Sequence, residues 1–143
     1  MLIVKDVMRA DSVHIHPKAT LLEAAEKMIH YGVDALPVAE GDQLIGVIRL
    51  ADLLTAPRSA HYDPRVPENR DEAQLLEIWK FLPVRNIMND QAISVSEDTS
   101  LMKAAAVMVN NGRQRLPVLR DGKVVGMITR ADVVRALLMI KRV

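Results

Sequence analysis

The chain has 143 residues, 50% of them hydrophobic and 3% aromatic, with a formal net charge of +1. This length suits one compact domain or two small halves that share a core, and so small a charge argues against a nucleic-acid partner. The absence of cysteine excludes disulfides, thiolate nucleophiles and cysteine metal ligands. Neither a signal peptide nor a spanning stretch is apparent, so we expect a cytoplasmic protein without membrane contact.

The first 57 residues predict an extended piece at 12–16 and then a helix that begins after Thr20. The Thr20 hydroxyl and the Glu23 carboxylate form a predicted capping box, and Gly32 ends the helix. Strands at 35–39 and 44–48 follow, joined by a turn, and a second helix runs from Ala51 to the residue before Pro57. Within the second strand, Gly46 allows the close approach of another backbone or helix.

Residues 58–82 are predicted to connect the two halves of the chain. The stretch begins with a proline-rich, irregular portion and continues with apolar residues at helical spacing over 68–81. Two interpretations of this amphipathic helix are open. It packs against the rest of the chain or a second copy, or it is a docking site for another protein.

Residues 83–143 repeat the first half at an offset of 80 residues. They predict an extended piece at 92–96, a helix at 100–111, strands at 115–119 and 123–128, and a final helix at 130–141. Two copies of one unit usually bury a shared face and leave a cleft related by a pseudo-twofold axis. The final helix is apolar on most sides over 133–140, so we expect a homodimer with helices of both repeats at its contact.

Three short motifs occur twice in the same order, at 4–8 and 84–88, at 32–38 and 112–118, and at 46–52 and 126–132. In these motifs each half resembles a cystathionine-β-synthase (CBS) domain, and the chain resembles a stand-alone tandem CBS pair over residues 3–56 and 83–137. The resemblance implies an α/β (α+β) fold in which two CBS-type β-α-β-β-α repeats, residues 1–57 and 83–143, pack as a pseudo-twofold pair.

The same resemblance implies a non-catalytic regulatory module. Clefts between CBS repeats bind adenine nucleotides such as AMP, ADP or ATP, and in some members S-adenosylmethionine. We therefore expect a sensor that needs no cofactor, takes an adenine nucleotide as its ligand and acts on a regulated protein that the sequence does not identify. The alternative function is a structural oligomerisation module with vestigial clefts. No catalytic motif is present to favour an enzyme.

The primary candidate site lies where the second repeat's last strand meets the final helix. A helix N-terminus suits a phosphate, the Thr129 hydroxyl adds a donor, and the Asp132 carboxylate can accept both hydroxyls of a ribose. By the resemblance, Arg115 faces the phosphates. Arg130 adds local positive charge, which favours a phosphate ligand. The residues assigned to the adenine by the same resemblance are Val13, His14 and Val33. The alternative is that Thr129 and Asp132 form a capping box with no ligand.

The first repeat departs from this pattern because Arg49 stands at the position of Thr129. An arginine can pair with phosphate bidentately, serve the other site, or fill its own pocket. The possible second site comprises Arg49, Asp52, Ile93, Ser94 and Arg113.

Two further side-chain patterns concern histidine and arginine. His14 and His16 alternate on one side of an extended piece, but no third ligand is evident and we assign no metal. Arg120 is expected to be a solvated surface charge.

Overall fold

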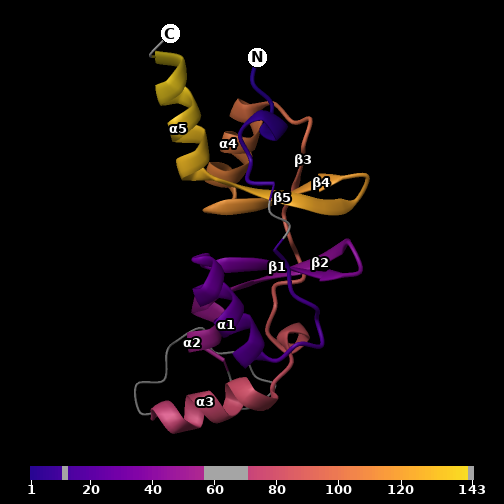
Figure 1. Ribbon diagram of the computed structural model, residues 1–143, viewed down its shortest axis with the longest axis vertical. Helices are drawn as coiled ribbons and strands as arrows, with labels where there is room; N and C mark the ends of the chain where they lie inside the picture. Colours follow the sequence, from indigo (N-terminus) through magenta and orange to yellow (C-terminus); the bar gives the residue numbers. More distant parts are fainter. Residues whose placement is uncertain (11–12, 57–70, 142–143) are drawn as a thin grey trace. The chain divides into compact units, whose positions relative to one another are not determined.

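The computed structural model describes residues 1–10, 13–56 and 71–141 as a mixed α/β protein (Figure 1). This confirms the predicted fold class. The chain forms two compact units: unit 1 is Met1–Val13 with Ile93–Val143, and unit 2 is His14–Ala92. The expected proline-rich part of the connection falls within 57–70, outside the described residues. In the described part of the chain, no helix combines the length and the hydropathy that a membrane crossing requires.

Unit 2 contains most of the first repeat. Helix α1 (Leu21–Tyr31) begins where the Glu23 N–H donates to the Thr20 hydroxyl at 3.2 Å, and ends at Gly32 with a left-handed φ of 64°. Strands β1 (Ala35–Glu40) and β2 (Gln43–Arg49) pair antiparallel, and Ile15 adds a parallel bridge to β1. The short helix α2 (Leu50–Leu54) follows β2 directly.

Unit 1 contains most of the second repeat. Strand β3 (Val95–Ser96) lies parallel to β4 (Arg115–Arg120), which pairs antiparallel with β5 (Lys123–Thr129). The β4–β5 turn uses positive φ at Asp121 (50°) and Gly122 (80°), the pairing that suits a tight hairpin. Helix α4 (Leu101–Asn110) is capped by Ser100, and α5 (Arg130–Lys141) begins where β5 ends.

The core of each unit is aliphatic and includes a fully buried methionine from its first long helix, Met28 in α1 and Met108 in α4. Met102 and Met139 are 61% and 60% exposed, although each stands in an apolar stretch of the sequence. The buried cluster of unit 1 comprises Val4, Val95, Leu101, Ala104, Met108, Leu116, Val118, Ile128 and Val133.

The leading segment of each repeat packs on the body of the other repeat. The short 3-10 helix η1 (Val4–Asp6) belongs to unit 1, where Arg9 and Met127 exchange backbone hydrogen bonds of 2.9 and 3.0 Å. Its counterpart η2 (Val84–Asn86) belongs to unit 2, where Asn89 and Val47 exchange bonds of 2.9 and 3.0 Å. In Figure 1 the indigo N-terminal segment accordingly lies beside the orange elements of the second repeat. The spatial units therefore differ from the sequence repeats in these segments.

Two glycines make room for the leading segments. A Cβ on Gly126 would collide with the backbone carbonyl oxygen of Arg9. A Cβ on Gly46 would lie 2.8 Å from the Met88 sulfur and 2.9 Å from the Asn89 carbonyl oxygen. The close approach expected at Gly46 is confirmed, and the approaching backbone is the leading segment of the other repeat.

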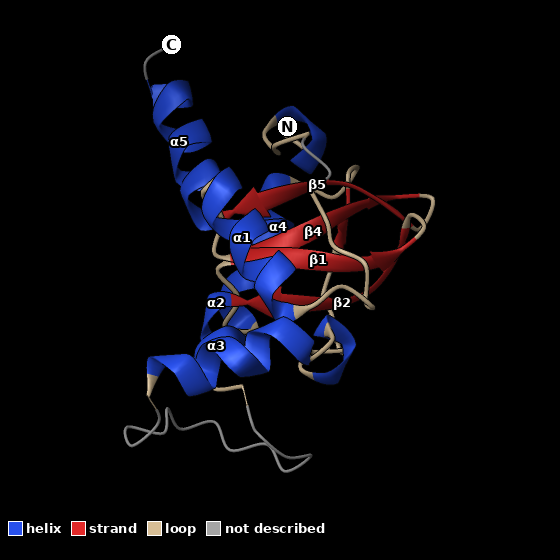
Figure 2. Ribbon diagram, turned by 60° about the horizontal axis from the view of Figure 1, so that its bottom comes forward, coloured by secondary structure: helices blue, strands red, loops and turns tan. Residues whose placement is uncertain are grey.

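The connecting helix α3 (Glu72–Phe81) starts later than residue 68, because Asp71 caps it: the Gln74 N–H donates to Asp71 Oδ1 at 2.8 Å. The helix packs against α1 (Figure 2). The Trp79 indole N–H also donates to the Leu53 carbonyl at 2.9 Å, which satisfies a carbonyl left open at the end of α2. Packing against the rest of the chain is thus confirmed for this helix.

Candidate functional site

The N-terminus of α5 carries the capping box that its sequence predicts. The Asp132 N–H donates to the Thr129 hydroxyl at 3.1 Å, and the Thr129 N–H donates to Asp132 Oδ2 at 2.9 Å. Asp132 is only 5% exposed, an unusual burial for an aspartate, and its carboxylate is held at the positive end of a helix of 12 residues. These bonds fix the carboxylate in place without any ligand.

Arg135, a residue that the sequence analysis did not single out, also binds this carboxylate. Its Nη2 donates to Asp132 Oδ1 at 2.6 Å, while 60% of its side chain is exposed. The i, i+3 spacing of an aspartate and an arginine on one helix is the signal that would have revealed the pair.

Arg115 lies near this helix start through the strand register. It is directly opposite Thr129 in the antiparallel β4–β5 pair, so the two side chains leave the same face of the strands. The register therefore brings an arginine to the strand end from which α5 starts, where Thr129 and Asp132 supply a hydroxyl group and a carboxylate.

Arg130 is hydrogen-bonded within unit 1, whereas Arg113 resembles Arg115 in having a buried Nε. Arg130 donates from Nε to the Arg113 carbonyl at 2.8 Å and from Nη2 to the Met108 carbonyl at 3.3 Å. It therefore ties α5 to the end of α4, where the Met108 carbonyl also accepts from the Arg113 N–H at 2.7 Å. The Nε of Arg113 is buried and finds no acceptor among residues 1–10, 13–56 and 71–141, so this guanidinium keeps a donor for other use.

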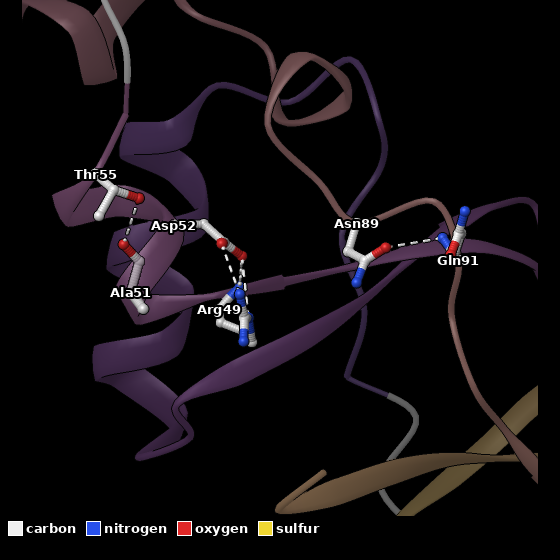
Figure 3. Close-up of polar contacts among 6 residues, drawn as sticks. All are labelled: Arg49, Ala51, Asp52, Thr55, Asn89 and Gln91. Atoms are coloured by element: carbon white, nitrogen blue, oxygen red, sulfur yellow. Dashed lines mark hydrogen bonds and ion pairs between the residues drawn. The ribbon is translucent and has the colours of Figure 1, made fainter. Parts of the chain in front are cut away.

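The corresponding helix start in unit 2 is built differently (Figure 3). Asp52, 4% exposed, accepts from the Arg49 N–H at 2.8 Å, but Arg49 has no oxygen to return a cap to the helix. Its guanidinium instead turns back onto the carboxylate, with Nη2–Oδ1 at 3.2 Å and Nε–Oδ2 at 3.5 Å. Of the three roles open to Arg49, occupation of its own pocket is the one this geometry favours.

The remaining candidate residues are distributed over both units. Val13, Ile93 and Ser94 are half-buried in unit 1, whereas His14 and Val33 are half-buried in unit 2. The His14 carbonyl accepts from Lys27 Nζ at 2.6 Å, which anchors that extended piece to α1. Contact of these five residues with a ligand stays a prediction. In the described segments, no group of three or more acidic, histidine or cysteine side chains is arranged to hold a metal.

Arg120 lies at the surface as expected, with 53% of its side chain exposed, but it is also one half of an ion pair that was not expected. Its Nε and Nη2 bind the two Glu97 oxygens at 2.6 and 2.9 Å, a bidentate pair in which the Glu97 side chain is 9% exposed. The hydrogen bond from Arg120 lowers the pKa of Glu97 below its ordinary value, against the opposing effect of burial, and the Arg120 charge adds to the lowering. The pKa of Arg120 is raised in turn, mainly by that hydrogen bond. Glu97 lies in a turn, so no periodicity revealed its partner.

The chain belongs to the CBS domain family. The family model for the CBS domain matches it twice, over residues 4–59 and 84–139. These two matches cover the two predicted repeats, including the three motifs that each repeat carries.

Among curated relatives, the chain is 31% identical to an uncharacterised protein of Methanopyrus kandleri, with 92% of this chain and 61% of that protein covered. It is 33% identical to the chloroplastic CBS domain-containing protein CBSX1 of Arabidopsis thaliana, over 94% of this chain and 63% of that one. The chain therefore spans somewhat less than two thirds of the length of these relatives.

Among solved structures, the Arabidopsis thaliana CBS-pair protein CBSX2 is 29% identical with a TM-score of 0.80, over 99% of this chain and 97% of that one. CBSX2 in complex with AMP matches with a TM-score of 0.76 at 29% identity, over 99% and 100% of the two chains. This likeness extends beyond either repeat alone to nearly the whole chain.

Proposed function

We propose that this protein is a regulatory module that binds an adenine nucleotide of the AMP, ADP or ATP type at the start of α5. The observation that carries the proposal is the buried Asp132 carboxylate at the N-terminus of α5. It is hydrogen-bonded to Thr129, the residue directly opposite Arg115 in the β4–β5 pair. The AMP complex of CBSX2, a relative that covers the whole chain, supports the choice of ligand class.

Each side chain has a separate part in this binding. Asp132 accepts hydrogen bonds from the ribose hydroxyls, and Thr129 with the first N–H groups of α5 faces the phosphate. Arg115 neutralises phosphate charge, and Val13, which belongs to the same unit, contacts the adenine. The residues needed are acceptors, donors and apolar surfaces, so the proposed role is non-catalytic and requires no cofactor. S-adenosylmethionine lacks a phosphate for Arg115 and is the less suitable ligand.

The proposed homodimer rests on the exposed apolar surface of α5. Val134, Leu138 and Ile140 are 55%, 51% and 55% exposed, although such side chains normally favour burial. A second copy that covers α5 removes this surface from water. Analytical ultracentrifugation should find a dimer that Leu138→Glu dissociates, whereas Glu72→Lys on α3 leaves it intact.

A thermal-shift screen tests the proposed function. A ligand that binds only the folded state stabilises it by about 2.7 kcal/mol at a hundred times its Kd, so AMP, ADP or ATP should raise the melting temperature. Adenosine tests the need for phosphate, and inorganic phosphate tests the need for the nucleoside. If no adenine compound at millimolar concentration shifts the melting temperature, the proposal is wrong.

The alternative function, a structural oligomerisation module, is favoured by one observation. Both aspartates at the helix starts already bind an arginine of their own repeat, so neither requires a ligand for its stability. In that case the dimer would persist while every nucleotide left the melting temperature unchanged. A pull-down whose partner is lost on deletion of Glu72–Phe81 would assign the interaction to α3.

A further inference from the structure

We infer that Arg135 competes with the ribose for Asp132 and thereby sets the affinity and the sugar preference of the proposed nucleotide site. This inference rests on the proposed function. Its starting point is the different way in which the two oxygens of Asp132 are held. Oδ2 accepts from the backbone N–H of Thr129 at 2.9 Å, whereas Oδ1 accepts from the side chain of Arg135 at 2.6 Å.

Only one of these two donors can leave without disturbing the fold. The Thr129 N–H belongs to the backbone at the junction of β5 and α5 and takes part in the capping box. Arg135 is 60% exposed on a long, flexible stem, so its guanidinium can exchange Asp132 for water. Oδ1 is therefore the oxygen that a ligand hydroxyl can claim.

The chemistry of the exchange is balanced. A carboxylate only accepts hydrogen bonds, and a ribose diol offers two O–H donors, so the sugar replaces the donor that Arg135 withdraws. No buried acceptor is left without a partner in either state. An unoccupied site of this kind is stable, and the ligand must first displace Arg135 from the carboxylate.

The first repeat supports this interpretation because its aspartate also binds an arginine, although that arginine stands at a different position in the sequence. The residue equivalent to Arg135 is Thr55, whose hydroxyl donates to the Ala51 carbonyl at 3.0 Å and not to Asp52. Asp52 instead receives the guanidinium of Arg49, which precedes it by three residues. Each aspartate thus binds one arginine, which precedes Asp52 by three residues and follows Asp132 by three residues. In both repeats the carboxylate is paired with a guanidinium.

The two arginines also differ in how firmly they hold their aspartates. Both aspartates accept a backbone N–H, from Arg49 and from Thr129, so the difference lies in the guanidinium groups. Arg49 reaches Asp52 through both Nε and Nη2, at 3.5 and 3.2 Å, whereas Arg135 reaches Asp132 through Nη2, at 2.6 Å. Displacement of the Arg49 guanidinium therefore breaks two hydrogen bonds against one for Arg135, and Arg49 is also the less exposed side chain, at 49% against 60%. We accordingly assign the readily opened position to Asp132.

The test compares the wild-type protein with Arg135→Ala by calorimetric titration with AMP and with 2′,3′-dideoxy-AMP. Lys103→Ala is the control, because it removes one positive charge from the exposed surface of α4 in the same unit without touching Asp132. The guanidinium of this pair is exposed to water while the carboxylate is buried, and loss of the competing donor should make Arg135→Ala bind AMP up to about fivefold more tightly. Its affinity for the dideoxy analogue should not increase, since that ligand has no hydroxyl for Oδ1.

Each outcome decides the inference. Tighter binding of AMP alone supports competition at the ribose. Unchanged or weaker AMP binding in Arg135→Ala overturns it, while the proposed function stands if the wild-type protein binds AMP. If Arg135→Ala binds AMP and the wild-type protein does not, the competition is supported, but the proposed function of the wild-type protein as a nucleotide sensor is wrong. If neither protein binds AMP, both the inference and the proposed function are wrong.

Discussion

Arg115 lies directly opposite Thr129 in the antiparallel pair β4–β5. At the same position of the first repeat, Ala35 lies opposite Arg49 in β1–β2. Each repeat thus places one guanidinium at this cross-strand pair, but from different strands. At the start of α5, Asp132 is bound by Arg135, which is 60% exposed, so the arginine of the cross-strand pair and the arginine on the aspartate are different residues. At the start of α2, Arg49 fills both positions, because it is the cross-strand residue and is itself bound to Asp52. The two helix starts are therefore not equivalent.

Arg115→Ala should separate phosphate recognition from nucleoside recognition. A hydrogen bond to a charged group contributes about 1.5–3 kcal/mol, so AMP affinity should fall by about tenfold or more, while adenosine affinity stays unchanged. Calorimetry with both ligands measures the difference. Arg85→Ala, an exposed arginine of unit 2, is the charge-matched control. Equal losses for AMP and adenosine would show that Arg115 does not contact the phosphate.

Gly126→Ala should destabilise the protein strongly, because the new Cβ meets a backbone carbonyl of the leading segment and not a movable side chain. Overpacking of this kind costs about 3 kcal/mol, which urea denaturation would detect as a lower midpoint. Gly41→Ala is the comparison: its φ is 62° and nothing lies within 4 Å of an added Cβ. That variant should lose only about 1 kcal/mol through backbone strain. Similar losses for both variants would contradict the close packing of Arg9 on β5.

The Glu97–Arg120 pair predicts a pH dependence of stability. Since the pKa of Glu97 is lowered on folding from its ordinary value of 4.5, its contribution is fully present above that value. The contribution is lost as the pH falls through the lowered pKa. Glu97→Gln cannot ionise, so it should be less stable than the wild-type protein at pH 7 and should approach it as the pH falls through the lowered pKa of Glu97. Urea denaturation over pH 3–7 measures this, and a difference that does not change with pH would contradict it.

Much of the fold could be predicted because its signals are local. The helices begin at Thr20 and Ser100 and the first ends at Gly32, as capping chemistry predicts, and the offset of 80 residues revealed the repeats. The start of α3 was placed too early, because apolar spacing does not show which residue caps a helix. The pairing of each leading segment with the other repeat depends on contacts distant in sequence, for which Gly46 was a local hint and Gly126 is its equivalent in the second repeat.

The capping residues of the candidate site could be predicted from the sequence, but the partners of the arginines around it could not. The Thr129–Asp132 capping box follows from four consecutive residues, and the structure contains it. Arg130 was assigned to the ligand from its charge alone, but its donors bind the carbonyls of Arg113 and Met108. The partners of Arg120 and Arg135 were missed for the same reason: the charge of an arginine is visible in a sequence, whereas the acceptor that its guanidinium reaches depends on the fold.

Titration of AMP into the wild-type protein and into Asp132→Ala tests the central claim most directly. Asp6→Ala is the control, since Asp6 Oδ2 also accepts a backbone N–H, that of Ile3 at 3.0 Å, away from α5. The account predicts saturable binding to the wild-type protein and to Asp6→Ala, with affinity about tenfold or more weaker in Asp132→Ala. Absence of binding to the wild-type protein at millimolar AMP, or equal affinity in Asp132→Ala, would contradict it.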